Sequence, residues 1–315
     1  MVSLLSFGEV LVDFLPQTLG ASSYAPLAGG APANVAVGFA KLGGASFFAG
    51  GISTDNFGAM LLDQLNNYGV DTSYVNKVAD ANTALVLVSL DKSGERDFNF
   101  YRQDSADMYF DSSHIDKINW QQLGIFHYCS NTLTDEKIYR NTLYALKSAK
   151  AANVVISFDV NLRQQLWSDL TLLPNRVDAC IKESDMVKLS KDEALYLAKI
   201  KQLELQDYVD ELIAQGVRLV VITDGANAVQ INSADYSLMV EVPSIQAVDT
   251  TAAGDSFISG VLFSLAQQVS VTNTLLDIFS NQEAVLAAVE FASQCGAYTC
   301  QNKGAFDALP KFSDL

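Results

Sequence analysis

Val248-Asp-Thr-Thr-Ala-Ala-Gly-Asp-Ser-Phe257 connects a predicted strand to a predicted helix. Upstream, residues 236–242 alternate between apolar and polar, which is typical of a strand, and downstream, apolar residues recur at helical spacing over 257–265. The small side chains of residues 252–254 leave the backbone N–H groups of the first helical turn accessible. These groups and the helix dipole attract an anion such as phosphate. The segment therefore predicts an anion site at a helix N-terminus.

Asp255 lies at this predicted anion site, where its carboxylate would repel a bound phosphate. A carboxylate in this position is explained if it takes a proton from an attacking hydroxyl group. The alternative is that Asp255 only caps the helix. The segment alone leaves both roles open.

Glycine-rich motifs near the N-terminus accompany this segment. They are Gly-Gly-Ala-Pro-Ala-Asn-Val-Ala at 29–36, Leu-Gly-Gly at 42–44 and Gly-Gly-Ile-Ser-Thr-Asp-Asn-Phe-Gly at 50–58. Together with residues 249–255, these motifs resemble the two signatures of the ribokinase-like (PfkB-type) sugar kinases, in the expected order. The resemblance covers nearly the whole chain. Within the family, the start at 8–13, residues 29–34 and Phe-Tyr-Arg at 100–102 most resemble fructokinases.

The composition limits the classes of function. The chain has 315 residues, 49% of them hydrophobic, and a formal net charge of −16. This size allows a large core, and the acidity argues against binding to nucleic acid or to an anionic membrane. No apolar run could span a bilayer and the N-terminus does not resemble a signal peptide, so we expect a soluble cytoplasmic protein. Four scattered cysteines and two histidines favour buried thiols over a zinc site.

The order of predicted elements indicates an α/β fold with a mostly parallel sheet. Residues 4–14 read as one buried strand, and residues 83–90 and 96–101 flank a hairpin signal at 91–94. The resemblance implies a three-layer, Rossmann-like core and a small β-sheet lid that closes over the sugar. We expect residues 1–14, 29–81 and 105–315 to form the core, and residues 15–28 and 82–104 to form the lid. A homodimer through the lid is a further implication of the resemblance.

Several polar residues are candidates for binding the sugar. Gly29 and Gly30 permit close approach of the backbone to a ligand, and the Asn34 amide offers a donor and an acceptor to a polyol, with helix capping as its alternative role. The resemblance implies that Asp13 binds sugar hydroxyls. Phe100 or Tyr101 is expected to face the sugar ring or to belong to the lid core.

Asp159, Asn161 and Arg163 alternate at the end of a predicted strand, so we expect them to share one face of an extended segment. By resemblance, Asn161 lies near the nucleotide phosphates and Arg163 near the acceptor sugar or the transferred phosphate. A salt bridge between Asp159 and Arg163 is the competing interpretation.

The resemblance also implies sites for ATP and for ions. Nucleotide-binding candidates are Asn161, Lys188, Glu193, Thr223, Gly225 and Ser293. Glu193 would bind Mg²⁺ through water. A monovalent cation, usually K⁺, would be held at Asp249, Thr251, Thr299, Asn302 and Gly304.

The sequence departs from the family pattern at Ser190, Asp224, Ser293 and Ala252. The last of these replaces a glycine, and if that position requires a positive φ, alanine costs on the order of 1 kcal/mol or more.

The sequence thus predicts an ATP-dependent kinase that phosphorylates a primary hydroxyl of a small sugar, with fructose as the expected acceptor. Asp255 would act as base, and the amides of Ala252, Ala253 and Gly254 would bind the transferring phosphoryl group. The alternatives are an aminoimidazole riboside or other nucleoside-type kinase, a 2-keto-3-deoxygluconate kinase, and a catalytically weak sugar-binding regulatory relative.

Overall fold

The computed structural model describes residues 2–16, 23–90 and 96–315. Among these residues, nine strands form one large sheet with the order β13-β12-β11-β10-β9-β8-β1-β4-β5. The strands from β11 to β5 run parallel, and β12 and β13 are antiparallel to their neighbours. The bounds are β1 Leu4–Phe7, β4 Ser46–Ser53, β5 Asp71–Val78, β8 Ile125–Cys129, β9 Val155–Asp159, β10 Met186–Ser190, β11 Leu219–Asp224, β12 Asn227–Asn232 and β13 Ser237–Val240.

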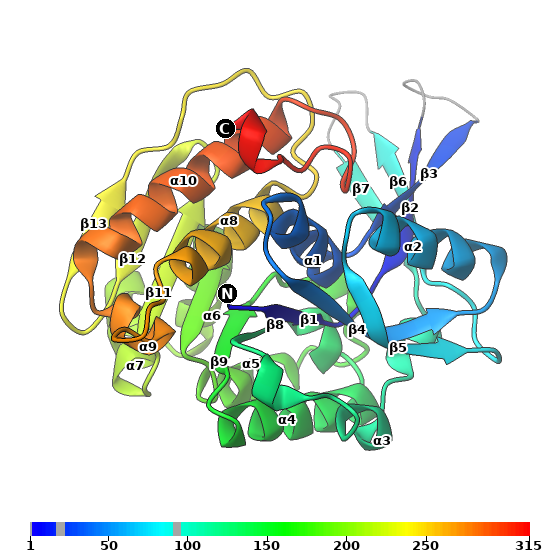
Figure 1. Cartoon of the computed structure of the whole chain (residues 1–315), viewed down its shortest axis with the longest axis horizontal. Helices are drawn as coiled ribbons and strands as arrows, with labels where there is room; N and C mark the ends of the chain where they lie inside the picture. Colours follow the sequence, from blue (N-terminus) through cyan, green and yellow to red (C-terminus); the bar gives the residue numbers. More distant parts are fainter. Residues whose placement is uncertain (1, 17–22, 91–95) are drawn as a thin grey trace.

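Helices cover both faces of this sheet, which confirms the expected three-layer α/β architecture (Figure 1). On one face lie α1 Ala31–Lys41, α2 Asn56–Asn67, α8 Ala253–Gln267, α9 Leu275–Phe279 and α10 Gln282–Cys300. On the other lie α3 Ser112–Ile115, α4 Glu136–Ala151, α5 Leu173–Ile181, α6 Lys191–Ile200 and α7 Leu205–Ala214. Short 3-10 turns occur at Ala106–Met108, Trp120–Gln122, Ser130–Leu133, Gln164–Leu166 and Phe312–Asp314.

A second sheet of four strands, in the order β3-β2-β6-β7, stands beside the large one (Figure 1). Its strands are β2 Leu11–Pro16, β3 Tyr24–Gly29, β6 Leu85–Leu90 and β7 Arg96–Tyr101. The predicted small sheet is therefore present. The hairpin signal at 91–94 and the expected lid residues 17–22 lie outside the described residues.

The expectation of a single strand over residues 4–14 is wrong. β1 ends at Phe7, the chain turns at Gly8, where φ is 146°, and β2 begins at Leu11 in the other sheet. Both strands are strongly apolar because β1 is buried in the large sheet and the start of β2 is buried where the sheets meet. Residues 11–14 therefore belong to the small sheet, although the sequence assigned them to the core.

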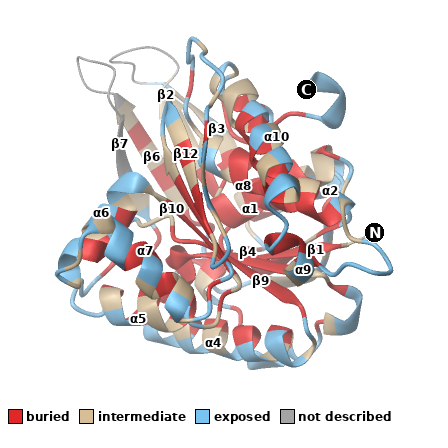
Figure 2. Cartoon of the chain, turned by 90° about the vertical axis from the view of Figure 1, so that its left-hand side faces the viewer, coloured by how far each residue is buried: buried red, intermediate tan, exposed pale blue. Residues whose placement is uncertain are grey.

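Burial follows the layers (Figure 2). Buried residues fill the strands of the large sheet and the inward sides of its helices, whereas the outward sides of helices such as α4 and α7 are exposed. This burial explains why we did not predict the strand β5, which lies at the sheet edge and has a single buried residue, Val78. Its apolar signal is correspondingly weak.

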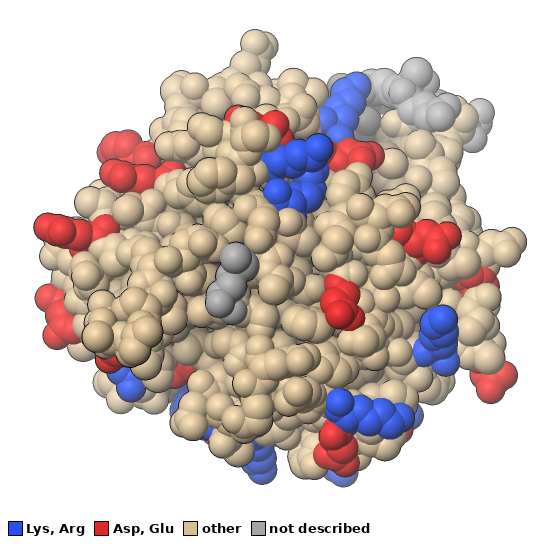
Figure 3. Space-filling view, viewed as in Figure 1, with Lys and Arg blue, Asp and Glu red and all other residues tan. Residues whose placement is uncertain are grey.

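The surface in Figure 3 carries acidic and basic side chains in small groups between wide uncharged areas. Within the part of the chain that the structure describes, no helix is both long enough and apolar enough to cross a bilayer.

Candidate active site

A cleft of about 1090 Å³ lies between the small sheet and the C-terminal ends of the large sheet's strands. Ligands of open α/β sheets bind at such an edge. The small sheet contributes mainly apolar residues, and the large sheet and its helices contribute most of the polar ones. The polar lining comprises Glu9, Asp13, Asn34, Asn131, Asn161, Arg163 and Asp255, together with residues of the 249–251 and 303–307 loops.

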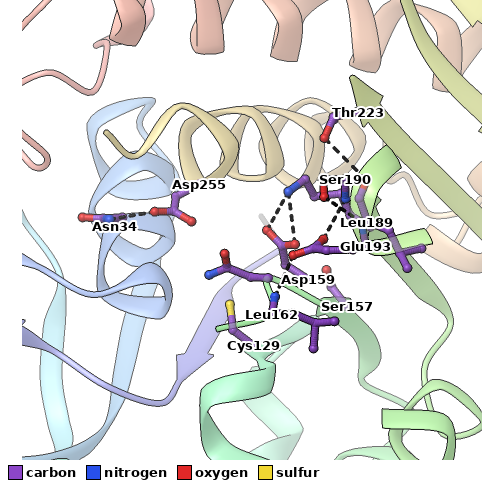
Figure 4. A network of polar contacts seen from close by, with 12 residues as sticks. Asn34, Cys129, Ser157, Asp159, Leu162, Leu189, Ser190, Glu193, Thr223 and Asp255 are labelled. Carbon is purple, nitrogen blue, oxygen red and sulfur yellow. Dashed lines mark hydrogen bonds and ion pairs between the residues drawn. The ribbon is translucent and has the colours of Figure 1, made fainter. Parts of the chain in front are cut away.

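Asp255 stands in the first turn of α8, as the sequence predicts, and its Oδ2 accepts a hydrogen bond of 2.7 Å from Asn34 Nδ2 (Figure 4). The N-cap of α8 is Ala252, which has no side-chain capping bond, and the N-cap of α1 is Gly30. The capping alternatives for Asp255 and Asn34 are therefore not what the structure shows. Burial raises the pKa of Asp255, and the Asn34 hydrogen bond and the charges of Lys188 and Arg163 only partly offset this increase. A raised pKa makes Asp255 a stronger base.

The Asn34 side chain is bound at only one end. Its Nδ2 bonds to Asp255, whereas its Oδ1 is buried and has no hydrogen-bond partner among the described residues. A buried amide oxygen of this kind is expected to accept a hydrogen bond from a ligand.

Asp13 and Gly30 line the cleft, and Gly29 packs directly against Asp13. A Cβ atom on Gly29 would lie 2.2 Å from Asp13 Oδ2, and one on Gly30, where φ is 106°, would lie 2.7 Å from the Glu9 carbonyl oxygen. Glycine is thus required at Gly30, where φ is positive and the nearest atoms belong to the backbone, whereas a side chain at position 29 would displace the Asp13 carboxylate. The sequence analysis explained these glycines by close approach of the backbone to a ligand, whereas the structure shows close contacts within the protein itself.

Beneath the first turn of α8 lies a buried ion pair. Lys188 Nζ contacts Asp159 Oδ1 and Oδ2 at 3.1 and 3.0 Å (Figure 4). A Cβ atom on Gly254 would lie 3.3 Å from the same Nζ, so this ammonium group faces the predicted anion site. Burial raises the pKa of Asp159 to about 7 despite the opposing effect of Lys188. Burial alone would lower the pKa of Lys188, but the attraction of Asp159 and Glu193 outweighs it and raises the pKa, so the lysine is charged.

This ion pair corrects two expectations about residues 159–163. Asp159 pairs with Lys188 rather than with Arg163. The strand β9 ends at Asp159, and Asn161 has a left-handed φ of 37°, so the three residues do not share one extended face. Asn161 and Arg163 line the cleft, whereas Asp159 is buried below it. Simple alternation missed the turn at Asn161.

The other predicted nucleotide residues lie outside the cleft lining. Glu193 accepts hydrogen bonds from the backbone of Leu162 at 2.6 Å and of Ser190 at 2.7 Å. Thr223 pairs in register with Ser190 at the ends of β11 and β10, and Gly225, with a φ of 57°, forms the turn into β12. Ser293 is buried in α10, where its hydroxyl donates to the carbonyl of Val289.

The departures from the family pattern have structural explanations. Ser190 and Glu193 form a capping box at the start of α6. Asp224 forms a salt bridge of 2.8 Å with Lys191, which balances its charge. Ala252 has φ 59° and ψ 11°, so an alanine occupies a left-handed conformation, as the sequence analysis anticipated.

The two segments predicted to hold a monovalent cation meet beside the cleft. The backbone N–H groups of Val248 and Asp249 donate to the carbonyl of Cys300, and Gly304 N donates to Asp249 Oδ2. Asp249 Oδ1 also accepts from Thr251 N at 2.7 Å. The Asn302 amide donates to the Tyr298 carbonyl, and the Thr299 hydroxyl is buried and bonds to Ser256 within the helix layer.

The two aromatic residues at the end of β7 point to different places. Phe100 lines the cleft and packs against the core of the small sheet, so it belongs to the lid core, and its contact with a sugar ring stays a prediction. Tyr101 is 63% exposed and does not line the cleft.

Two buried polar residues of the cleft were missed by the sequence analysis. Glu9 and Asn131 are both buried and joined by a hydrogen bond of 2.8 Å. The sequence feature that could have identified Glu9 is a glutamate inside an apolar run, next to a glycine. No sequence feature singles out Asn131.

Comparisons with known proteins agree with this geometry. Residues 1–311 match the family described as pfkB family carbohydrate kinase. The chain is 37% identical to probable fructokinase-5 of Arabidopsis thaliana over 99% of this chain and 95% of that protein. The structure resembles the ATP-bound fructokinase of Xylella fastidiosa, with a TM-score of 0.94 and 36% identity over 99% of this chain and 96% of the other. It also resembles a fructokinase double mutant from Vibrio cholerae O395 in its fructose-, ADP- and potassium-bound form, with a TM-score of 0.88 and 31% identity over 98% and 96% of the two chains. The chain therefore belongs to the pfkB family of carbohydrate kinases.

Proposed function

We propose that this enzyme transfers the γ-phosphate of ATP to a primary hydroxyl group of fructose. The observation that carries the proposal is the partly buried Asp255 carboxylate, which projects from the first turn of α8 into a cleft lined by side chains that can form hydrogen bonds with hydroxyl groups. The fructokinases similar to this chain supply the expected acceptor. The choice of fructose therefore rests on those relatives, and the chemistry rests on the site.

In this mechanism Asp255 takes the proton of the sugar hydroxyl as its oxygen attacks the γ-phosphorus in line. Asn34 holds the carboxylate, and its free Oδ1 accepts a hydrogen bond from the sugar. The amides of residues 252–254 and the nearby ammonium group of Lys188 stabilise charge on the transferring phosphoryl group. Asp13, Phe100 and Arg163 complete the sugar side of the cleft.

The small sheet acts as a lid in this proposal, with residues 15–28 and 82–104 as its predicted extent. Closure over the sugar would exclude water, which would otherwise accept the phosphoryl group. Dimerisation through this sheet and a cytoplasmic location stay predictions.

Two ions fit the residues present. Glu193 would hold Mg²⁺ through water, with the nucleotide phosphates as its direct ligands. Mg²⁺ there would neutralise the β- and γ-phosphates. The Asp249 carboxylate and the carbonyl-rich segment 299–304, which hydrogen bonds draw together, suit K⁺. The nucleotide roles of Thr223, Gly225 and Ser293 stay predictions.

A coupled ADP-release assay tests the proposal with fructose, ribose, 2-keto-3-deoxygluconate and aminoimidazole riboside as acceptors. We expect the highest kcat/KM with fructose. A higher kcat/KM with aminoimidazole riboside or with 2-keto-3-deoxygluconate would show that this compound, and not fructose, is the preferred substrate. Sugar binding without turnover of any acceptor would instead identify a regulatory relative and overturn the proposed activity.

A further inference from the structure

Glu9 is a buried carboxylate at the point where the chain crosses from the large sheet to the small one. It lies between β1 and β2, is 1% exposed and lines the cleft. Its Oε1 accepts a hydrogen bond of 2.8 Å from Asn131 Nδ2. Its Oε2 is buried and has no hydrogen-bond partner among the described residues. Buried polar atoms are nearly always paired, so this oxygen calls for an explanation.

Asn131 has the same feature. Its side chain is held by Glu9 through Nδ2, and its Oδ1 is buried without a partner in the described part of the chain. Together with Asn34 Oδ1, the cleft therefore presents two buried amide oxygens, which can only accept hydrogen bonds, and the Glu9 carboxylate oxygen, which accepts when Glu9 is ionised. A ligand that satisfies them must bring several hydrogen-bond donors and few acceptors, as a set of hydroxyl groups does.

A buried network fixes this pair of residues in place. Arg102, which follows the last residue of β7, donates from Nη2 to the Asn131 carbonyl at 3.1 Å and from Nη1 to Thr134 Oγ1 at 3.2 Å. Its Nε contacts Asp107 Oδ2 at 2.6 Å, and Ser105 Oγ donates to Asp107 Oδ1 at 2.5 Å. The charge of Arg102 also stabilises ionised Glu9, against the effect of burial, which is larger and raises the pKa of Glu9. Hydrogen bonds that fix the position of ligand-binding residues in this way are typical of a preorganised binding site.

We propose that Glu9 and Asn131 form a specificity-determining pair that accepts hydrogen bonds from hydroxyl groups of the sugar other than the one that is phosphorylated. The pair selects a neutral polyol and disfavours sugars that lack a hydroxyl at the contacted position or carry a carboxylate there. A site built to bind a hydroxyl group rejects the analogue that lacks it strongly, because its buried acceptors are then unpaired. This inference rests on the proposed sugar-kinase function.

The test compares Glu9→Gln with the wild-type enzyme on fructose and on a series of deoxyfructoses, each lacking one hydroxyl. Glutamine keeps the size of the side chain and the carbonyl oxygen that Asn131 requires, but replaces the free acceptor by an amide donor. We expect the KM for fructose to rise about 10- to 100-fold, with the KM for ATP changing less than about 2-fold. In the wild type, one deoxyfructose should bind weakly, and in Glu9→Gln its disadvantage against fructose should disappear.

A second variant, Asn131→Ala, distinguishes binding from a structural role. It should lose discrimination against the same deoxyfructose or the one lacking the adjacent hydroxyl. Its effect should not add to that of Glu9→Gln, because residues in contact with the same ligand group are coupled. Exposed Glu290→Gln is the matched control, and it should change neither KM value.

The outcomes separate this inference from the proposed function. Wild-type enzyme that phosphorylates no sugar would overturn the proposed function. Active wild-type enzyme with an unchanged fructose KM in Glu9→Gln would overturn only the role of the pair. The role of the pair would also be overturned if both variants lost activity equally for fructose and every deoxyfructose and had a lower melting temperature. That result would indicate a structural role.

Discussion

The Asn34 amide on α1 donates a 2.7 Å hydrogen bond to the Asp255 carboxylate on α8, so two helices far apart in sequence jointly position the candidate base. α1 and α8 pack side by side above the large sheet (Figure 1). The hydrogen bond engages Oδ2, and in the proposed mechanism Oδ1 takes the proton of the sugar hydroxyl. Any shift of one helix against the other would therefore misplace the base.

Asp255→Asn removes the base while keeping the shape of the side chain. We expect kcat to fall by about 10²–10⁴ with nearly unchanged fructose binding, because an amide cannot accept the hydroxyl proton. Steady-state kinetics and calorimetric titration with fructose check this. The exposed Asp63→Asn should behave as wild type. An unfolded Asp255→Asn protein would instead point to a structural role.

The pH dependence of kcat/KM should report Asp255. Its pKa is raised by burial, and only the ionised carboxylate is a base, so activity should be lost on acidification at a higher pH than an ordinary aspartate would give. Asn34→Ala removes a hydrogen bond that lowers this pKa, so the acidic limb should move to still higher pH. A limb that stays in place in Asn34→Ala would show that another group controls the profile.

Ala252→Gly should stabilise the protein. Alanine at φ 59° is strained, and relief of this strain exceeds the extra entropy of glycine in the unfolded chain, so we expect a gain of roughly 0.5–1 kcal/mol in the free energy of unfolding. Urea unfolding measures it. The same substitution at the exposed Ala287, inside α10, should cost about 1 kcal/mol. Effects of equal sign at the two positions would contradict the strain argument.

Lys188→Met leaves Asp159 as an unpaired buried carboxylate. Removal of one partner of a buried pair costs about 3–5 kcal/mol, and the KM for ATP should rise because the ammonium group faces the anion site. The folded-state pKa of Asp159, already raised to about 7, should rise further, so protonation favours the fold and the variant should regain stability as pH falls from 8 to 5. Adding Asp159→Asn should restore stability but not ATP affinity. A double variant with wild-type KM for ATP would remove Lys188 from the nucleotide site.

The sequence predicted best where a local motif defines the backbone. The helix that begins within residues 248–257, the strands at 83–90 and 96–101 and the α/β class each follow from nearby residues, and the structure has them as expected. Contacts across the sheet could not be predicted in this way. The partner of Asp159 is Lys188 because β9 and β10 run parallel in a register that places them opposite each other. Glu9 and Asn131 meet only after β1 and β8 pair, so neither could be recognised from its own neighbours.

Only residues 8–10 separate β1 in the large sheet from β2 in the small one. Gly30 alone separates β3 from α1, and Arg102, which follows β7, is held by hydrogen bonds to Asn131 and Thr134. The small sheet is therefore attached to the rest of the protein at one end of its strands, both at β2 and β3 and at β7. We expect any opening of the cleft to move the other ends of these strands most, and Glu9, which lies within one of the attachments, to keep its place.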